Sequence, residues 1–196
     1  MPLWGATDSD ESKPKFLTDE QKKQCFATKS GWVLENGALT GNDNANADPE
    51  ILVAIGELAT SIGAADITQI EFITTAFDKS DGGNIDVRVR FNEAVDVVTT
   101  GGTPTLAITN GNQGSGTGRG PHAAAYTSGT GTNELVFAIT IGAAAGSIAA
   151  DDVLVVGANA INLNSGTIKD AGTSTNSTIT NVEAIGTAAG SITAVA

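Results

Sequence analysis

Apolar and charged residues alternate most regularly in the middle of the chain. Residues 85–91 read Ile-Asp-Val-Arg-Val-Arg-Phe, and the two classes alternate there without exception. Residues 134–141 follow the same period of two, with Leu135, Phe137, Ile139 and Ile141 as the side chains that would point inward. Because successive side chains of a β-strand point to opposite faces, each segment is predicted as a strand with one buried and one solvated face.

Similar short β-rich runs follow one another from residue 50 onward. Clusters of Gly, Asn, Asp and Thr separate them, and no convincing amphipathic crossover helix lies between them. This arrangement predicts an all-β fold, as an antiparallel sandwich or barrel. The predicted strands are residues 51–55, 67–73, 85–91, 95–98, 105–109, 123–127, 134–141, 153–156, 160–163 and 178–185.

The N-terminal residues follow a different pattern. Pro2 and Pro14, with the polar residues between them, predict an extended arm. Thr18 and Gln21 have the spacing of a helix capping box, which predicts a short helix over residues 19–27.

These patterns divide the chain into two parts. Residues 35–48, rich in Asn, Gly and Asp, are predicted as turns and loop. We therefore expect an N-terminal arm and attachment segment over residues 1–49 and a β-sandwich domain over residues 50–196.

Composition and charge narrow the function classes. The 196 residues are 40% hydrophobic, which is enough for a core, and the formal net charge is -12. Such a charge repels phosphate backbones and anionic lipids, so we expect neither nucleic acid nor membrane as a partner. No apolar window approaches the length of a membrane span, and residues 1–15 lack the apolar run of a secretory signal. The single cysteine, Cys25, cannot form an intrachain disulfide, which suits synthesis in a reducing cytoplasm.

Residues with catalytic potential are scarce. His122 is the only histidine, and no Gly-x-Ser-x-Gly motif surrounds the neighbouring Ser128. Cys25 is accompanied by lysines but by no histidine, so a packing role fits it better than a nucleophilic one. We predict no catalytic residue, and the chain is not expected to be an enzyme.

Two segments superficially suggest ligand sites. Asp78, Asp81 and Asp86 surround a Gly-Gly turn with oxygen ligands that suit calcium, but their spacing departs from an EF-hand and turn formation explains them more simply. The glycine-rich residues 110–120 suggest a phosphate loop, but a predicted strand follows them where such a loop needs a helix. We therefore predict no metal and no cofactor.

Five residues are candidates for binding a partner. Trp4, Phe16 and Trp32 are aromatic residues in or beside the polar N-terminal segment, and aromatic anchors are enriched at interfaces. Such an aromatic near a polar terminus either folds back on the body or docks into another subunit, and we favour docking. Arg88 and Arg90 share the solvated face of one predicted strand, where they either pair with surface acids or contact a partner.

Residues 83–179 carry motifs in a recognisable order. They are Asn84 to Val95, Thr103 to Leu106, Ala125 to Phe137 and Leu163 to Asp170. In this order they resemble an immunoglobulin-like (Ig-like) repeat of bacterial and phage adhesins and virion proteins. The resemblance implies an antiparallel Ig-like β-sandwich used for binding, spacing and display, without catalytic residues.

The remaining residues resemble a narrower group. The segments are Met1 to Gly5, Ser12 to Lys15, Ala27-Thr28, Gly31 to Leu34 and Glu50 to Ile55. They look like the amino-terminal region of structural proteins in contractile-tailed phages that infect marine cyanobacteria.

The phage resemblance implies a virion component assembled in the host cytoplasm, most simply a capsid decoration or head-surface protein. Its partners would be the major capsid protein or another virion protein, and further copies of itself in a homo-oligomer. Two alternatives stay open. One is an adhesin that binds host glycans through residues 110–121 and 128–133, and the other is a tail or baseplate component.

Overall fold

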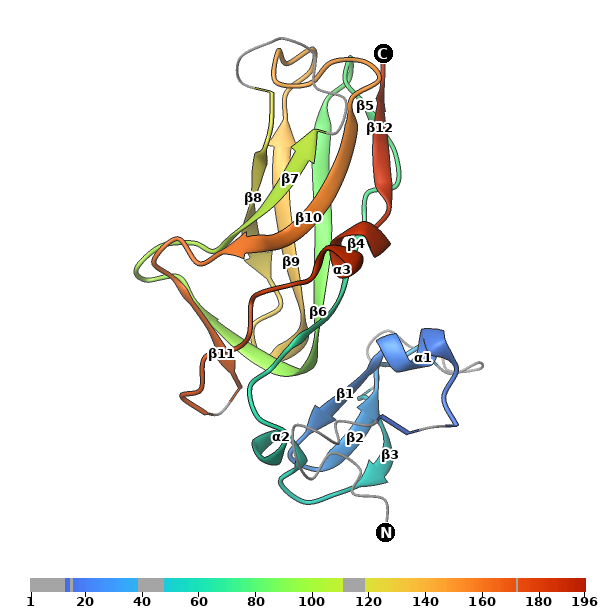
Figure 1. Ribbon diagram of the computed structural model, residues 1–196, viewed down its shortest axis with the longest axis vertical. Helices are drawn as coiled ribbons and strands as arrows, with labels where there is room; N and C mark the ends of the chain where they lie inside the picture. The colour runs from blue at the N-terminus through green and yellow to red at the C-terminus, as the bar shows by residue number, and fades with distance from the viewer. Residues whose placement is uncertain (1–12, 15, 39–47, 111–118, 172) are drawn as a thin grey trace.

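The computed structural model describes residues 13–14, 16–38, 48–110, 119–171 and 173–196 (Figure 1). The described chain is mostly β, and its twelve strands form one large mixed sheet that does not close on itself. The elements are α1 (Asp19–Lys23), β1 (Cys25–Thr28), β2 (Gly31–Leu34), β3 (Glu50–Ala54), α2 (Leu58–Ser61), β4 (Ile67–Phe72), β5 (Phe77–Asp78), β6 (Gly83–Val98), β7 (Thr105–Asn110), β8 (His122–Ser128), β9 (Thr132–Ile141), β10 (Val153–Asn162), β11 (Thr167–Asp170), α3 (Glu183–Ala188) and β12 (Ser191–Val195).

The predicted capping box is confirmed at the start of α1. The Thr18 hydroxyl accepts a hydrogen bond from the Gln21 backbone N–H at 3.2 Å, and the Gln21 side chain accepts one from the Thr18 N–H at 3.0 Å. The helix is shorter than predicted, because residues 25–28 leave it to form β1 against β2. Pairing as a strand buries Cys25 and Phe26, which an isolated surface helix would leave in water.

Three strands and two short helices, α1 and α2, build a small N-terminal subdomain, which we define as the described residues from Lys13 to Ile62. Strand β3 pairs with β2, so residues 50–54 lie with the N-terminal strands rather than in the β-sandwich domain predicted to begin there. The Gly31 backbone makes this pairing possible, since a Cβ at Gly31 would lie 2.0 Å from the Val53 carbonyl oxygen. The subdomain has its own apolar cluster, formed by Leu17, Cys25, Ala27, Trp32, Leu34, Leu58 and Ile62.

The body, residues 65–196, is built around β6. The predicted alternation is confirmed there, because Ile85, Val87 and Val89 are fully buried while the intervening side chains point to the other face. Strand β6 joins the predicted strands 85–91 and 95–98 into one and pairs antiparallel with β4, β9 and β11. From β9 the sheet continues through β8, β7, β10 and β12 to β5.

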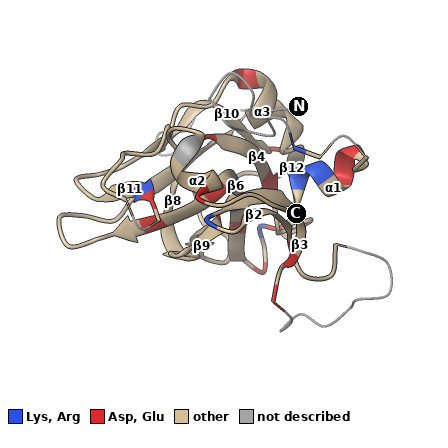
Figure 2. Cartoon of the chain, turned by 90° about the horizontal axis from the view of Figure 1, so that it is seen from below, with Lys and Arg blue, Asp and Glu red and all other residues tan. Residues whose placement is uncertain are grey.

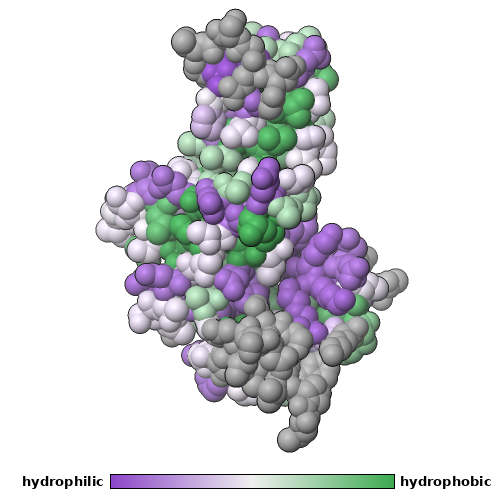
Figure 3. Space-filling model, viewed as in Figure 1, coloured by the Kyte–Doolittle hydropathy of each residue, from purple (hydrophilic) through white to green (hydrophobic). Residues whose placement is uncertain are grey.

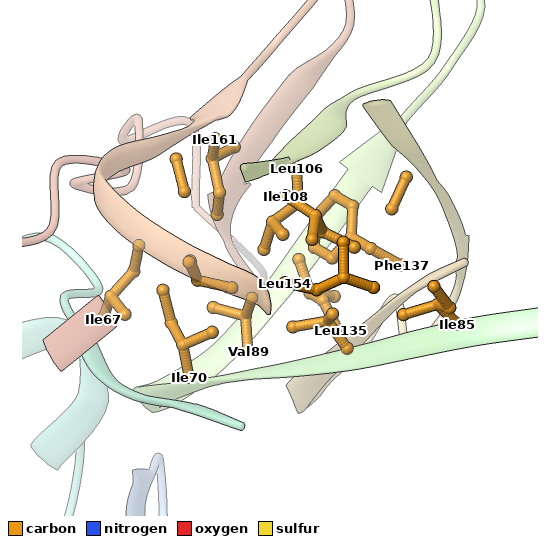
Figure 4. Packing of buried hydrophobic residues seen from close by; sticks show 14 of the residues in the cluster. Ile67, Ile70, Ile85, Val89, Leu106, Ile108, Leu135, Phe137, Leu154 and Ile161 are labelled. Atoms are coloured by element: carbon orange, nitrogen blue, oxygen red, sulfur yellow. The ribbon is translucent and has the colours of Figure 1, made fainter. Parts of the chain in front are cut away.

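The strands of the body surround one core of their own. Apolar side chains from β4, β6, β7, β9 and β10 converge in one cluster, which Figure 4 shows from close by. Most pairings are antiparallel, but β1 runs parallel to β6 and β12 runs parallel to β5. The sheet is therefore mixed, rather than antiparallel throughout as predicted.

Residues 177–190 lie between β4 and β10, and we call this segment with its contacts to the two strands the seam. Helix α3 packs against both strands, which lie far apart in the pairing order. The Thr178 N–H donates to the Ala65 carbonyl at 2.8 Å, and Asn181 bonds the backbone of β10. A predicted strand over residues 178–185 is wrong, because part of it forms α3. The close approach of that helix requires Gly186, whose Cβ would lie 2.5 Å from the Gly157 carbonyl oxygen.

Candidate functional site

The N-terminal subdomain meets the body along β6, and we call this contact the joint. Ala27 of β1 pairs in parallel with Glu93 of β6, and the Glu35 backbone, just after β2, is held by the Gln24 carbonyl. A pocket of about 540 Å³ opens beside the contact. Its subdomain wall includes Phe26, Val33 and Ile51, and its body wall includes residues 131–134.

The Arg90 guanidinium is the centre of the joint. Its Nε donates to Glu134 at 2.6 Å and to Glu35 at 3.3 Å, and its Nη2 donates to Glu35 at 3.3 Å. Its Nη1 donates to Gln69 at 2.9 Å and to Glu71 at 3.1 Å. Arg90 therefore connects the N-terminal subdomain with β4 and β9 of the body.

Arg88 and Asn133 complete this network. The Arg88 Nε donates to Glu71 at 2.6 Å and its Nη1 donates to Glu134 at 3.3 Å. The Asn133 side-chain amide donates to Glu35 at 2.8 Å. Of the two roles predicted for Arg88 and Arg90, pairing with acids is the one that the structure contains.

The sequence predicted a solvated face for both arginines, and at Arg90 this is wrong. Only 7% of the Arg90 side chain is exposed, because Glu35 and its neighbours cover this part of the sheet. Arg90 lies directly opposite Glu134 on β9, and Arg88 lies opposite Glu71 on β4, so opposite charges face each other across the strands. The alternation in residues 134–141 already placed Glu134 on the polar face. Glu35, predicted only as part of a loop, carried no comparable signal.

Burial and charge shift two pKa values at the joint. Burial raises the pKa of Glu35, as does the nearby Glu134 carboxylate, while the Asn133 hydrogen bond and the Arg90 guanidinium act in the opposite direction. Burial lowers the pKa of Arg90, but Glu35, Glu134 and Glu71 outweigh it and leave the pKa raised. Arg90 therefore stays charged, whereas Glu35 holds its proton more strongly than an exposed glutamate.

The aromatic candidates lie in different environments. Trp4 lies outside the described residues. Phe16 is 69% exposed just before α1, where its ring is accessible to a partner. Trp32 is fully buried in the cluster of the N-terminal subdomain, so its side chain serves that core and offers no exposed surface for docking.

A second polar cluster lies at the ends of β7, β8 and β10. The buried Asp152 carboxylate forms an ion pair with Arg119 and accepts hydrogen bonds from the Asn110 amide at 3.0 Å and the Ala149 N–H at 2.9 Å. These contacts fix both ends of the connection between β7 and β8. Residues 111–118 of the predicted glycine-rich tip lie outside the described part of the chain.

His122 lies at the start of β8 and is buried. Burial lowers its pKa, and the Asp152 carboxylate opposes that effect. A small pocket of about 210 Å³ borders His122, and its other lining residues are Thr, Ala, Pro and Asn. The sequence favoured a surface histidine at a strand edge, and the structure differs, because His122 is buried where β8 pairs with β7.

Local hydrogen bonds hold the turn around Gly82 and Gly83, whose acidic residues resemble a set of calcium ligands. Asp78 accepts from the Ser80 N–H at 2.8 Å and from the Ser80 hydroxyl, and these bonds lower the pKa of Asp78. Within the described ranges, no group of three His, Cys, Asp or Glu side chains could hold a metal ion. The part of the chain described here also contains no helix long and apolar enough to cross a bilayer.

Comparison with known proteins gives no relative. No family model, curated protein or solved structure matches this chain.

The exposed surface mixes apolar and charged groups. On the face seen in Figure 3, apolar residues emerge among hydrophilic ones over the body. Exposed large apolar side chains of the described residues are Phe16, Ile51, Ile73, Val98, Val182 and Val195. Figure 2 shows basic and acidic residues side by side on α1, where Lys22 pairs with Asp19 and Lys23 pairs with Glu20.

Proposed function

We propose that this protein is a non-enzymatic structural component of a phage virion, most simply a capsid decoration or head-surface protein. It attaches through its N-terminal region and displays the body away from the particle. The proposed partner is the major capsid protein or another virion protein of a contractile-tailed phage of marine cyanobacteria, with further copies of the chain forming a homo-oligomer.

The observation that carries this proposal is the distribution of parts along the molecule. The N-terminal subdomain lies at one end of an elongated chain, and the described ends of the connection between β7 and β8 lie at the other (Figure 1). Asp152 holds those ends rigidly through Arg119 and Asn110. A body with a small attached subdomain at one end and a fixed loop base at the other suits attachment and display.

The proposal includes an Ig-like class for the body. Strands β4, β6, β7, β8, β9 and β10 enclose one core, and neighbouring strands along this path run antiparallel. The motifs that resemble Ig-like repeats lie mainly on β6, β9 and β11 and the turns beside them. These features support the proposed class, while the continuity of the sheet departs from two separate layers.

A glycan-binding adhesin is the second candidate, supported by the fixed base of the connection between β7 and β8. The two loops predicted to bind glycans cannot form one site, however, because they lie at opposite ends of β8. Gly131 and Thr132 belong to the body wall of the pocket at the joint, so this loop lies at the end of the body that faces the N-terminal subdomain. A glycan site would therefore have to use residues 110–121 alone.

Location in purified particles tests the main proposal. Quantitative mass spectrometry of phage particles that encode this chain should find it at an abundance comparable to the major capsid protein. A few copies per particle would favour the tail or baseplate, and absence from particles would overturn a virion role. Deleting residues 1–15 should abolish incorporation of the chain into particles while the body stays folded. The control is the full-length chain expressed at the same level.

A further inference from the structure

The joint contains more carboxylates than guanidinium groups. Glu35 from the N-terminal subdomain, Glu71 from β4 and Glu134 from β9 share Arg88 and Arg90 of β6. Asn133 contributes a neutral amide to the same group. Other titratable residues close by are the Cys25 thiol on β1, which interacts electrostatically with both Lys13 and Glu35, and Glu93 on β6 at the bridge to Ala27.

We propose that the joint is proton-coupled: Glu35 takes up a proton when the N-terminal subdomain seats on the body, so that seating is tighter at mildly acidic than at alkaline pH. Seating brings Glu35 beside Glu134 and leaves only 15% of its side chain exposed. Arg88 and Arg90 together face Glu35, Glu71 and Glu134, so two guanidinium groups leave one of the three carboxylates uncompensated.

Protonation removes the uncompensated charge without removing the neutral contact. A protonated Glu35 keeps a carbonyl oxygen that can accept the hydrogen bond from the Asn133 amide. When the subdomain separates, Glu35 returns to water and titrates at its ordinary pKa. The raised pKa of Glu35 in the seated form, caused first by burial and then by Glu134, agrees with this direction.

The sign of the pH dependence follows from linkage. A carboxyl whose pKa is raised by seating stabilises the seated form fully below its ordinary pKa, and this contribution is lost as pH rises through the raised value. Between the two pKa values, the seating equilibrium weakens by a factor of about ten for each pH unit. This inference goes beyond the proposed function and does not depend on a virion role.

Hydrogen exchange in the full chain tests the coupling. After correction for the intrinsic exchange rate, protection of β1 and of residues 92–94 should fall as pH is raised from 5 to 8. Amides of β10 provide the internal reference and should change little. In Glu35→Gln, which keeps an amide oxygen for Asn133 but has no titratable charge, protection at the joint should be independent of pH.

A matched control separates this effect from general charge removal. Glu20→Gln removes one negative charge from the exposed surface of α1 in the same subdomain and should keep the wild-type pH profile. A wild-type profile in Glu35→Gln would overturn the proposal. Loss of protection in that variant at every pH would overturn it too, because seating would then need the ionised Glu35.

Glu35→Gln could fail to fold for other reasons, so a second variant and a direct titration of Glu35 provide independent tests. Asn133→Asp places another carboxylate beside Glu35, so protection at the joint should be lost at pH 8 and recovered at pH 5. In the wild type, carbon-13 NMR of the Glu35 carboxyl should give a pKa above the ordinary value of an exposed glutamate. A Glu35 pKa at or below that ordinary value, or an Asn133→Asp joint unaffected by pH, would overturn the coupling.

Discussion

The joint and the seam connect parts of the same molecule by opposite means. At the joint, the Glu35 carboxylate of the subdomain bonds the Arg90 guanidinium and the Asn133 amide of the body, with a single parallel strand pair beside them. At the seam, backbone groups, the neutral Asn181 amide and the α3 helix hold β4 to β10, while the Ser177 hydroxyl and the Ala65 N–H donate to the buried Asp170 carboxylate. Neutral hydrogen bonds and apolar packing respond little to pH or salt, so the contacts of Asn181 and α3 should be constant under conditions that change the joint.

The two cores provide the largest test of this comparison. Trp32→Ala should remove about 3–5 kcal/mol from the N-terminal subdomain, because it empties the centre of that cluster. Burial raises the pKa of Cys25 to about 11 in the folded chain, so thiol labelling at pH 8 should accelerate strongly in this variant. Circular dichroism of the body should change little. Phe137→Ala is the matched change in the core of the body. If both variants lost the circular dichroism signal of the body equally, the two cores would not be independent.

Arg90→Met removes the centre of the joint and leaves three glutamates without their shared guanidinium. Breaking such a buried network costs about 3 kcal/mol at neutral pH. Chemical denaturation should report a smaller loss at pH 4.5, since the remaining carboxyls can protonate. Arg88→Met is the control, because its side chain is more exposed and the variant keeps the bonds from Arg90 to Glu35. Equal losses in the two variants would contradict a central role for Arg90.

Asn181→Ala tests the seam. The change leaves the Ala160 N–H and the Gly157 carbonyl without their side-chain partner, which costs about 2 kcal/mol. Urea unfolding at pH 5 and pH 8 should give the same loss, in contrast to the joint variants. A loss that differs strongly between the two pH values would show that charge matters at the seam.

The exposed ion pairs of α1 give the smallest effect. Lys23→Ala removes the contact with Glu20, but both side chains are largely in water and alanine is a strong helix former. Thermal unfolding should change by less than about 0.5 kcal/mol. A larger loss would mean that charge pairs on this surface contribute as much as those of the joint.

Strict alternation was the most informative signal in the sequence. It predicted residues 85–91 and 134–141 as strands, and both lie in long strands of the sheet. Strand β2 was not predicted, because all four of its residues are buried and no polar position alternates with them. The short strand β12 was also missed.

The joint could be predicted only in part. Alternation placed Arg88, Arg90 and Glu134 on polar faces, and pairing across neighbouring strands follows from that. Glu35 could not be assigned, since its partner Asn133 is 98 positions away in the sequence and a loop residue has no period. The predicted strand over residues 178–185 failed for a similar reason, because the tight contact between Gly186 and β10 is a tertiary feature.

The contacts of Asp152 with Asn110 and Arg119 have a practical consequence for engineering. Since Asn110 and Arg119 are both anchored to a buried carboxylate, the geometry of β7 and β8 is fixed from outside the segment that connects them. The entropy of closing a loop grows only slowly with its length. Foreign peptides grafted between Asn110 and Arg119 should therefore leave the rest of the protein folded, which would make the connection between β7 and β8 a suitable insertion point.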